Sequence, residues 1–438
     1  MTDAAFGRMR RLLPHGSMRR SVGVLAGGHA LAQAVAAISY PFLTRLYTPA
    51  QFGNFAAAAS LLGLVLVVTC LAYDHAVPLP EQDETAGDLV VLSVLATIAL
   101  STVSAVALIV AGEQILGVVH ASALASAWWL LVAAQAAGGL YLALTGWAVR
   151  DRDFGDLATA RLGQGIATAG TQLIAGVAGA GAAGLMAGDA LGRSTGAGRL
   201  AARRLRGLAA AFAGTSRARL RAAARRYRRF PLVASWPLLV NATALEAPLL
   251  LLVVFYGAET GGHFALAQRL IGAPVALGVL SIGQVFVAEA AEMRRAGSAE
   301  LTRLFSTTLR RLALVGVPLM LLIPVPALLL VPPIFGESWS EAGVFIAILT
   351  PLYAAQLLSS PLGGTLTVLE RQDLLLVREL VRICLLGAAI VIAELLAFPA
   401  AAAVAMLSAG GTLAYVVYGA ISFHALRAYD RGRDDGDR

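Results

Sequence analysis

The segment Tyr47–Leu61 decides the fold. It reads YTPAQFGNFAAAASL, and a related segment, YGAETGGHFALAQRL, occupies Tyr256–Leu270 about half a chain later. Aligned without gaps, the two segments share a tyrosine, a glycine, a phenylalanine, two alanines and a leucine. Each of them joins two long apolar runs. The sequence therefore predicts two halves that are built on one plan.

The composition around these segments is that of a membrane protein. Apolar residues make up 58% of the chain and charged residues 14%, whereas a soluble domain has about 25% charged residues. A helix needs about 20 apolar residues to cross the hydrocarbon core of a bilayer. We predict twelve such spans, near residues 22–44, 52–72, 88–111, 124–148, 157–179, 181–200, 231–256, 263–288, 307–330, 341–366, 375–396 and 399–426.

The spans and the repeat together predict the fold. We expect an all-α polytopic membrane protein with about twelve transmembrane helices in two pseudo-symmetric six-helix lobes around a central cavity. Both copies of the repeated segment start at the outer face, so an axis along the membrane normal is expected to relate the lobes. The predicted parts are an N-terminal lobe (1–200), a basic cytoplasmic linker (201–230), a C-terminal lobe (231–426) and a cytoplasmic tail (427–438).

The arginines predict the orientation. All 34 Lys-or-Arg residues are arginine, and cytoplasmic loops of membrane proteins accumulate positive charge. With the N-terminus inside, 32 of them lie within or beside segments on the cytoplasmic side, and Arg45 and Arg269 are the exceptions. We therefore expect a multi-pass protein of the bacterial inner membrane with both termini in the cytoplasm.

The sequence also argues against several classes of function. It has no phosphate-binding loop, no His-Glu-x-x-His pair and no Gly-x-Ser-x-Gly elbow. Its two cysteines, Cys70 and Cys384, lie in apolar runs and form no metal-ligand cluster. The basic charge lies between spans rather than on a soluble face, which argues against a nucleic-acid partner. We expect no enzyme activity, no metal and no cofactor.

Several motifs resemble those of a known family. The runs GHALAQ at 28–33, PFLTRLYTPAQFG at 41–53, YDHAVPLP at 73–80 and GHFALAQR at 262–269 are similar to segments of Wzx-type polysaccharide (O-antigen/lipopolysaccharide) flippases. These proteins belong to the multidrug/oligosaccharidyl-lipid/polysaccharide exporter (MOP) superfamily. Family members often carry Arg-Tyr-Glu after the second helix, where this chain departs from the pattern with Ala-Tyr-Asp at 72–74.

The resemblance implies a function and its partners. A flippase of this kind moves an undecaprenyl-diphosphate-linked oligosaccharide from the cytoplasmic to the periplasmic leaflet by alternating access, for surface polysaccharide biosynthesis. The implied partners are this lipid-linked oligosaccharide, membrane lipids, the glycosyltransferases that act before it and the polymerase or ligase that acts after it. A coupling ion, either proton or sodium, would drive the cycle.

Charges inside spans are the first candidates for the site, because each costs about 2.5–3.5 kcal/mol on insertion scales. Arg269 lies about two turns in from the outer end of the eighth span, and a planar guanidinium chelates the oxygens of a diphosphate well. We expect it to bind substrate, with a structural ion pair as the alternative. Glu246 in the seventh span is its expected counter-charge, and either couples transport to protons or only neutralises Arg269.

Polar residues complete the candidate site. Gln33, Gln268 and Asn241 are expected to contact sugar hydroxyls or to form interhelical hydrogen bonds, and the family resemblance favours sugar contact for Gln33. Arg45, at the outer end of the first span, is expected to anchor the interface or to meet the diphosphate on release. Asp189 lies near the basic end of the sixth span, where a local pair with the arginine four residues later is the ordinary expectation.

Two further features have structural explanations. Small residues recur at every fourth position from Gly184 to Gly196, which predicts close helix packing. Residues 199–229 look helical and carry many arginines. This basic segment is expected to anchor the topology and link the lobes, and the alternative is a surface helix that binds anionic headgroups.

Three other functions remain alternatives. An ion-coupled exporter of small organic or drug molecules on the same scaffold predicts an acidic cavity, which Arg269 argues against and Glu246 leaves open. A membrane polymerase or lipid glycosyltransferase generally needs a large extramembrane loop, and the predicted outer loops are too short. A purely structural scaffold does not explain charges inside spans.

Overall fold

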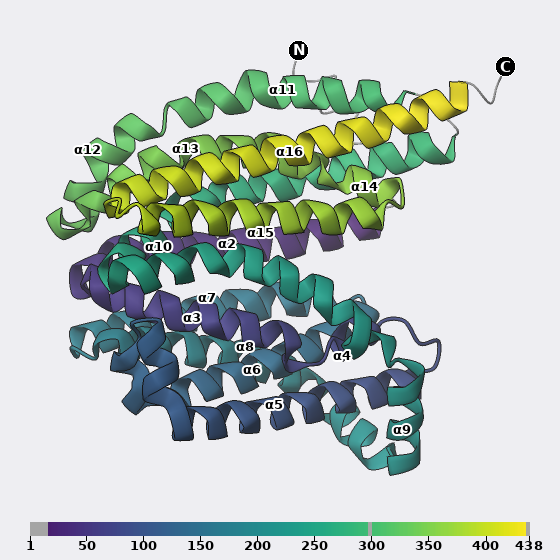
Figure 1. The fold of residues 1–438 in the computed structure, drawn as a ribbon. Coiled ribbons are helices and arrows are strands. Elements are labelled where there is room, and N and C mark those ends of the chain that lie inside the picture. Colours follow the sequence, from purple (N-terminus) through teal and green to yellow (C-terminus); the bar gives the residue numbers. More distant parts are fainter. Residues whose placement is uncertain (1–15, 297–299, 435–438) are drawn as a thin grey trace. The chain divides into compact units, whose positions relative to one another are not determined.

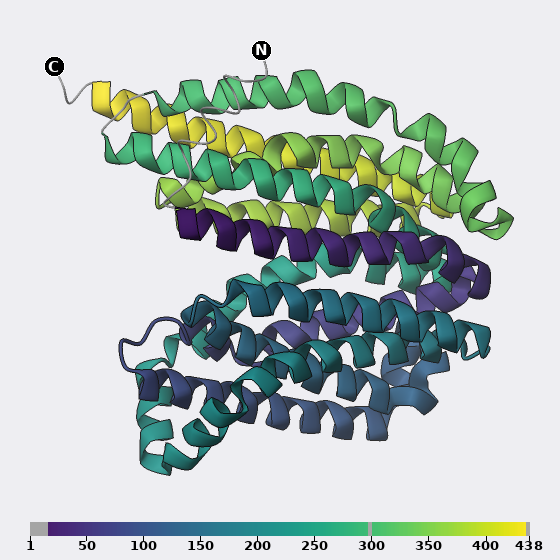
Figure 2. The ribbon, with the colours of Figure 1, turned by 180° about the vertical axis from the view of Figure 1, so that it is seen from behind.

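The computed structural model describes residues 16–296 and 300–434. Within these ranges helices dominate and no residue is in a strand. Figure 1 shows the helices with their labels, and Figure 2 shows them from behind. The chain divides into two compact units, Met1–Ala242 and Thr243–Arg438, here called the N-terminal and C-terminal units. The predicted all-α class is confirmed.

The N-terminal unit is an array of long helices joined by short turns. α7 packs against both α2 and α8, and α6 packs against α5 and α8. A single 3-10 turn, Ser122–Ala127, precedes α6. The helices are α2 (Gly16–Leu46), α3 (Pro49–Thr69), α4 (Tyr73–Ala76), α5 (Asp83–Val118), α6 (Trp128–Arg150), α7 (Phe154–Val177), α8 (Gly181–Gly214) and α9 (Arg217–Arg226).

The C-terminal unit begins inside a helix. α10 starts at Ser235, crosses the boundary between the units and continues to Arg295. It is broken at Gly257, where φ is +85°, a backbone conformation that favours glycine. α16 packs against α13 and α15, and α13 also packs against α11 and α12. The other helices are α11 (Leu301–Leu321), α12 (Pro324–Phe335), α13 (Ser340–Ser359), α14 (Gly364–Val368), α15 (Gln372–Leu395) and α16 (Ala400–Asp434).

The helices coincide with the predicted spans. Each span overlaps a helix, and α10 holds two of them on either side of its break at Gly257. In the described part of the chain, seven helical stretches are long and apolar enough to cross a membrane: Pro49–Thr69, Asp83–Val118, Ser122–Arg150, Phe230–Arg295, Leu301–Leu321, Glu337–Val368 and Ala400–Arg431. Large apolar side chains such as Val110 and Val177 are more than three-quarters exposed, as expected for helices in lipid. The total of twelve spans stays a prediction.

The repeated segment takes matching positions in the two units. It opens α3 in the N-terminal unit and the second part of α10 in the C-terminal unit. Phe55 and its counterpart Phe264 are exposed by only 3% and 1%, and the two aligned alanine pairs are buried as well. At the start of α3, Thr48 and Gln51 form a reciprocal capping box, which satisfies two backbone donors that the helix leaves unpaired.

The row of small residues in α8 packs against α7. A Cβ atom added to Gly188 would lie 2.9 Å from the carbonyl oxygen of Thr168, and one added to Gly192 would lie 2.9 Å from that of Gln164. Backbones approach this closely only where a side chain is missing. The predicted packing role of the row is therefore what the structure shows.

The basic segment 199–229 is largely helical, as its sequence predicts. α8 continues without a break to Gly214, and α9 follows after two residues. Both helices are tied to the start of α5 and to the α6–α7 loop by ion pairs described below. The division of the chain falls between Ala242 and Thr243, and a linker role for residues 201–230 stays a prediction.

Candidate functional site

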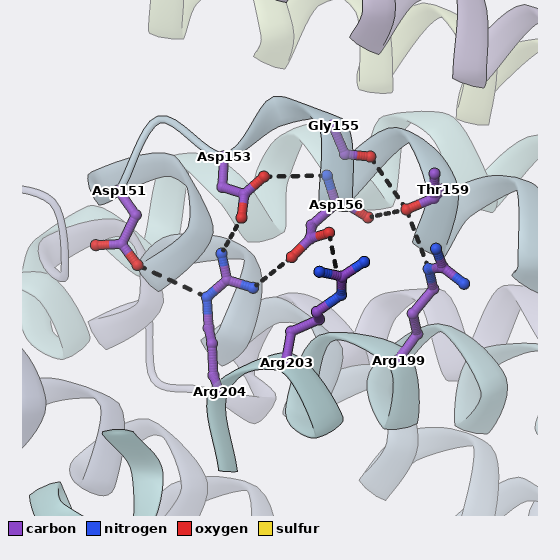
Figure 3. Close-up of polar contacts among 8 residues, drawn as sticks. All are labelled: Asp151, Asp153, Gly155, Asp156, Thr159, Arg199, Arg203 and Arg204. Carbon is purple, nitrogen blue, oxygen red and sulfur yellow. Dashed lines mark hydrogen bonds and ion pairs between the residues drawn. The ribbon is translucent and has the colours of Figure 1, made fainter. Parts of the chain in front are cut away.

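Ion pairs gather where α8 passes the loop between α6 and α7 (Figure 3). The Arg204 guanidinium lies 3.3 Å from Asp153, 3.5 Å from Asp156 and 3.7 Å from Asp151. Arg204 is buried, with 9% of its side chain exposed. Asp153 also accepts a hydrogen bond from the backbone N–H of Asp156 and so caps α7. One arginine therefore holds the whole loop.

Two more arginines of α8 lie along the start of α7. Arg203 is 3.7 Å from Asp156, and Arg199 donates a hydrogen bond of 3.0 Å to the hydroxyl of Thr159. Figure 3 shows these side chains reaching from α8 toward α7. The arginine-rich part of α8 is thus an extension of the N-terminal unit.

The start of α5 receives arginines from two other elements. Arg150, at the end of α6, donates to Asp83 at 2.7 Å and to the carbonyl oxygen of Glu81 at 3.2 Å. Arg219 of α9 lies 3.1 Å from Asp88, which is nearly fully buried. Three loops that the arginine distribution assigns to one side of the membrane are therefore connected by ion pairs.

Two titratable groups at this end of the unit have shifted pKa values. The hydrogen bond that His75 donates to Asp74 at 3.1 Å raises the pKa of His75 above its ordinary value. Burial raises the pKa of Asp151, although the nearby charges of Arg204 and Arg150 oppose this.

The C-terminal unit repeats the arrangement. Arg294, at the end of α10, lies 3.0 Å from Glu370 and also donates to the carbonyl oxygen of Val368. Asp430 of α16 accepts a hydrogen bond of 2.9 Å from the backbone N–H of Thr302 at the start of α11. As in the N-terminal unit, these contacts join loops and helix ends that the predicted topology places on the cytoplasmic side of the membrane.

Other charges lie within helices rather than at their ends. On α15, Glu379 accepts hydrogen bonds from Arg378 at 2.7 and 3.0 Å and lies 2.6 Å from Arg382. The Arg378 guanidinium stacks 4.1 Å above the ring of Tyr418 on α16. All three charged side chains are about 15% exposed. Two guanidinium groups thus share one carboxylate inside the unit.

A family model described as polysaccharide biosynthesis protein matches residues 42–344. That is well over half of the chain. The chain belongs to this family. No curated protein shows a significant sequence match.

Solved structures of transporters share the fold of this family member. Lipid II flippase MurJ in an inward closed conformation has a TM-score of 0.67 and 11% identity, covering 93% of this chain and 90% of its own. An inward-facing multidrug resistance MATE family transporter of the MOP superfamily has a TM-score of 0.62 and 14% identity, with 92% and 96% covered. A point mutant of the Vibrio cholerae MATE transporter VcmN has a TM-score of 0.54 and 13% identity, with 94% and 96% covered. These identities show the fold alone.

Family and fold together establish the broad class of this protein. It is a multi-pass membrane protein of the polysaccharide biosynthesis family, and its fold is that of MurJ and of MATE family transporters. The resemblance read from the sequence is confirmed at this level. In the part of the chain that the structure describes, no three His, Cys, Asp or Glu side chains form a group that could hold a metal ion.

The predicted site residues divide between the units of this polysaccharide biosynthesis protein. Gln33 and Arg45, on α2, are exposed in the N-terminal unit, and so is Asn241 at its end. Gln268, Arg269 and Glu246 are half-buried on α10 in the C-terminal unit. Arg269 follows the break at Gly257 and Glu246 precedes it. A common site for all of these residues stays a prediction.

Asp189 forms the expected pair with Arg193, at 2.7 Å, and both side chains are mostly buried. Asp189 lies about 12 Å and Arg193 about 18 Å along α8 from its start at Gly181, at 1.5 Å per residue. Since α8 continues to Gly214, this pair lies well inside the helix. The Arg193 guanidinium lies beside Gly138 of α6.

A row of polar groups lies on the helices next to this pair. Gln135 of α6 donates a hydrogen bond of 3.4 Å to Thr69 of α3, and Cys70 donates one of 3.2 Å to the carbonyl oxygen of Gly139. Gln135 also lines an apolar cavity of about 290 Å³ between α3, α5 and α6. Gln135 is not among the predicted site residues, because a lone glutamine in an apolar run gives no signal of its partner.

Proposed function

We propose that this protein translocates an undecaprenyl-diphosphate-linked oligosaccharide from the cytoplasmic to the periplasmic leaflet of the bacterial inner membrane, for surface polysaccharide biosynthesis. The observation that carries the proposal is the match of residues 42–344 to the polysaccharide biosynthesis family. The flippase fold supports it, because MurJ, a lipid II flippase, has the same architecture. Alternating access between two units is the proposed mechanism.

The charges inside helices support an anionic substrate. Arg269 is half-buried on α10, and Arg378 and Arg382 share one carboxylate on α15. A diphosphate is recognised best by guanidinium groups, which donate two hydrogen bonds in one plane. We propose Arg269 as the principal diphosphate ligand, with Gln268, Gln33 and Asn241 contacting sugar hydroxyls and Arg45 assisting release.

The coupling ion is proposed to be a proton or sodium. We propose Glu246 and Asp189 as the carboxylates that bind or release it. Asp189 is paired with Arg193 at 2.7 Å, so protonation of Asp189 would break a buried pair and shift the packing of α8. The glycosyltransferases and the polymerase or ligase of the same pathway are the proposed partners.

Deletion of the gene followed by lipid analysis tests the proposed function. The deletion strain is expected to accumulate glycan-loaded polyprenyl diphosphate on the inner leaflet, and the intact chain is expected to reverse this. Normal carrier levels in the deletion strain would contradict the proposal.

The second candidate is export of small organic or drug molecules. It is favoured by the likeness to MATE transporters, which have the same fold. This candidate predicts altered drug tolerance in the deletion strain with unchanged lipid-linked intermediates. The same strain therefore separates the two functions.

A further inference from the structure

We propose that α9 and the start of α10 form a binding surface for the phosphate headgroups of anionic phospholipids. The surface comprises Arg217, Arg221 and Arg225 of α9 together with the apolar residues Leu232, Val233 and Trp236. It lies in the N-terminal unit and is independent of which substrate the protein moves. Its role would be to fix this end of the unit at the membrane surface.

α9 has two faces with different chemistry. Arg217, Arg221 and Arg225 recur at every fourth position and therefore share one side of the helix. All three are exposed. Arg219 and Ala223 lie on the opposite side, where Arg219 binds Asp88 and Ala223 is 5% exposed. The helix thus has one face directed into the protein and one directed away from it.

The inward face holds α9 firmly in place. Besides Asp88, Arg219 lies 3.6 Å from Glu84 and donates a hydrogen bond of 3.0 Å to the carbonyl oxygen of Gly214. Ser216 caps the helix by accepting a hydrogen bond from the backbone N–H of Arg219. Thr215 donates to Asp88 as well. The outward arginines are therefore presented in a fixed arrangement, which reduces the entropy that binding costs.

The outward face has charge without counter-charge. Within residues 16–296 and 300–434, the acidic partners of α9 are Glu84 and Asp88, and both bind Arg219. Three guanidinium groups on one face of a ten-residue helix repel one another. An anionic surface that supplies several phosphates at once relieves this repulsion and accepts hydrogen bonds from each guanidinium.

Neighbouring residues identify the anionic surface as a membrane. Leu232, Val233 and Trp236 follow α9 closely and are 62–65% exposed. They open the stretch Phe230–Arg295, which is apolar enough to span a membrane. Tryptophan is enriched at membrane–water interfaces. Arginines followed by exposed apolar side chains fit a lipid headgroup layer better than a soluble acidic protein or a nucleic acid.

The contact of α9 with α5 places α9 at the depth of the lipid headgroups. α9 packs beside the first turns of α5, and both helices are labelled in Figure 1. On α5, exposed apolar residues begin at Leu95 and continue through Ile98 and Val103. Leu95 lies about 10 Å along the helix from Asp88. An element bound at Asp88 is therefore near the boundary where the hydrocarbon layer meets the headgroups.

The test uses the full-length protein in a neutral detergent, titrated with phosphatidylglycerol or with phosphatidylcholine of the same acyl chains. Bound lipid is counted by native mass spectrometry, and the thermal midpoint is recorded in parallel. The wild type is expected to prefer phosphatidylglycerol. The triple variant Arg217→Gln/Arg221→Gln/Arg225→Gln is expected to lose about 100-fold of this preference at low salt, since each surface arginine contributes about fivefold. Added salt is expected to lower the preference of the wild type for phosphatidylglycerol, because salt screens the charges.

Two controls make the result specific. Arg303→Gln/Arg310→Gln/Arg311→Gln removes the same charge from α11 and is expected to leave the preference nearly unchanged. Arg217→Lys/Arg221→Lys/Arg225→Lys keeps the charge and is expected to retain most of it. Equal binding of the two lipids by the wild type, an undiminished preference in the glutamine variant of α9, or an equal loss in the α11 variant would each overturn the proposal.

Discussion

The hydroxyl of Tyr47 donates a hydrogen bond of 2.6 Å to the backbone carbonyl oxygen of Gln172. This contact joins the turn before α3 to the last two turns of α7, across 125 positions of the chain. Tyr47 is also packed against Gly176 and Gly184. Its counterpart in the repeat, Tyr256, is buried at the hydroxyl but makes no hydrogen bond with any described residue.

The two tyrosines predict opposite outcomes for the same substitution. Tyr47→Phe is expected to lower the free energy of unfolding by about 1 kcal/mol, the usual net contribution of a hydrogen bond. Tyr256→Phe is expected to change it little, because no hydrogen bond is lost. Thermal melting of the purified variants measures both. Equal losses at the two positions would show that the hydroxyl of Tyr47 is not what holds the turn.

Close packing of α8 on α7 predicts a strong position dependence among glycines. Gly192→Ala is expected to cost about 1–3 kcal/mol, because the new methyl group overlaps Thr168 and approaches the backbone of Gln164. Gly198→Ala, six residues later in the same helix, meets no atom within 4 Å. It is expected to be neutral or to stabilise by about 0.5–1 kcal/mol through helix propensity. Thermal melting of the two variants in one detergent measures the difference. A Gly198→Ala variant that is as destabilised as Gly192→Ala would contradict the prediction.

Arg204 is expected to be the most sensitive arginine of the basic segment. Arg204→Gln leaves three aspartates without their shared cation and is expected to cost about 1–3 kcal/mol. This is less than for a fully buried pair, because Asp151 and Asp153 are nearly half exposed. The exposed neighbour Arg206 serves as the control, and Arg206→Gln is expected to stay within about 0.5 kcal/mol. Similar losses for both variants would contradict the role of Arg204.

His75 predicts a pH dependence of stability. Its pKa is raised above the ordinary value of 6.5 by the hydrogen bond to Asp74, so the folded state binds this proton more tightly than the unfolded state. The stabilisation is fully present below pH 6.5 and is lost as the pH rises through the raised pKa. Melting curves from acidic to alkaline pH are expected to show the advantage of wild type over His75→Gln shrinking across this window. A constant or growing difference would refute the assignment.

Arg269 and Glu246 provide the test of the transport proposal. Arg269→Gln is expected to reduce translocation of the lipid-linked oligosaccharide about 10–100-fold, as for the loss of a charge-assisted hydrogen bond, and Arg269→Lys by less. The charge swap Glu246→Arg/Arg269→Glu is expected to remain inactive if Arg269 contacts the diphosphate. Restored glycan export by the swap would instead mean that the two residues only neutralise each other.

Much of the fold follows from local sequence. The apolar runs coincide with the helices because hydrophobic length is a property of consecutive residues. The aligned phenylalanines of the repeat, Phe55 and Phe264, are both buried, as a duplicated plan predicts. The partners of the basic segment could not be predicted, because no local signal shows that Arg204 and Arg219 bind acids far away in the chain.

The sequence alone determined the helical membrane class, the positions of the long apolar helices and the family resemblance, since hydropathy, charge bias and short motifs are read from neighbouring residues. Only the tertiary structure decided which charges are paired. Arg204 binds residues about fifty positions earlier and Arg219 binds Asp88 across 131 positions. Such pairs depend on which helices lie side by side, and that arrangement is set by packing of the whole unit rather than by any single segment.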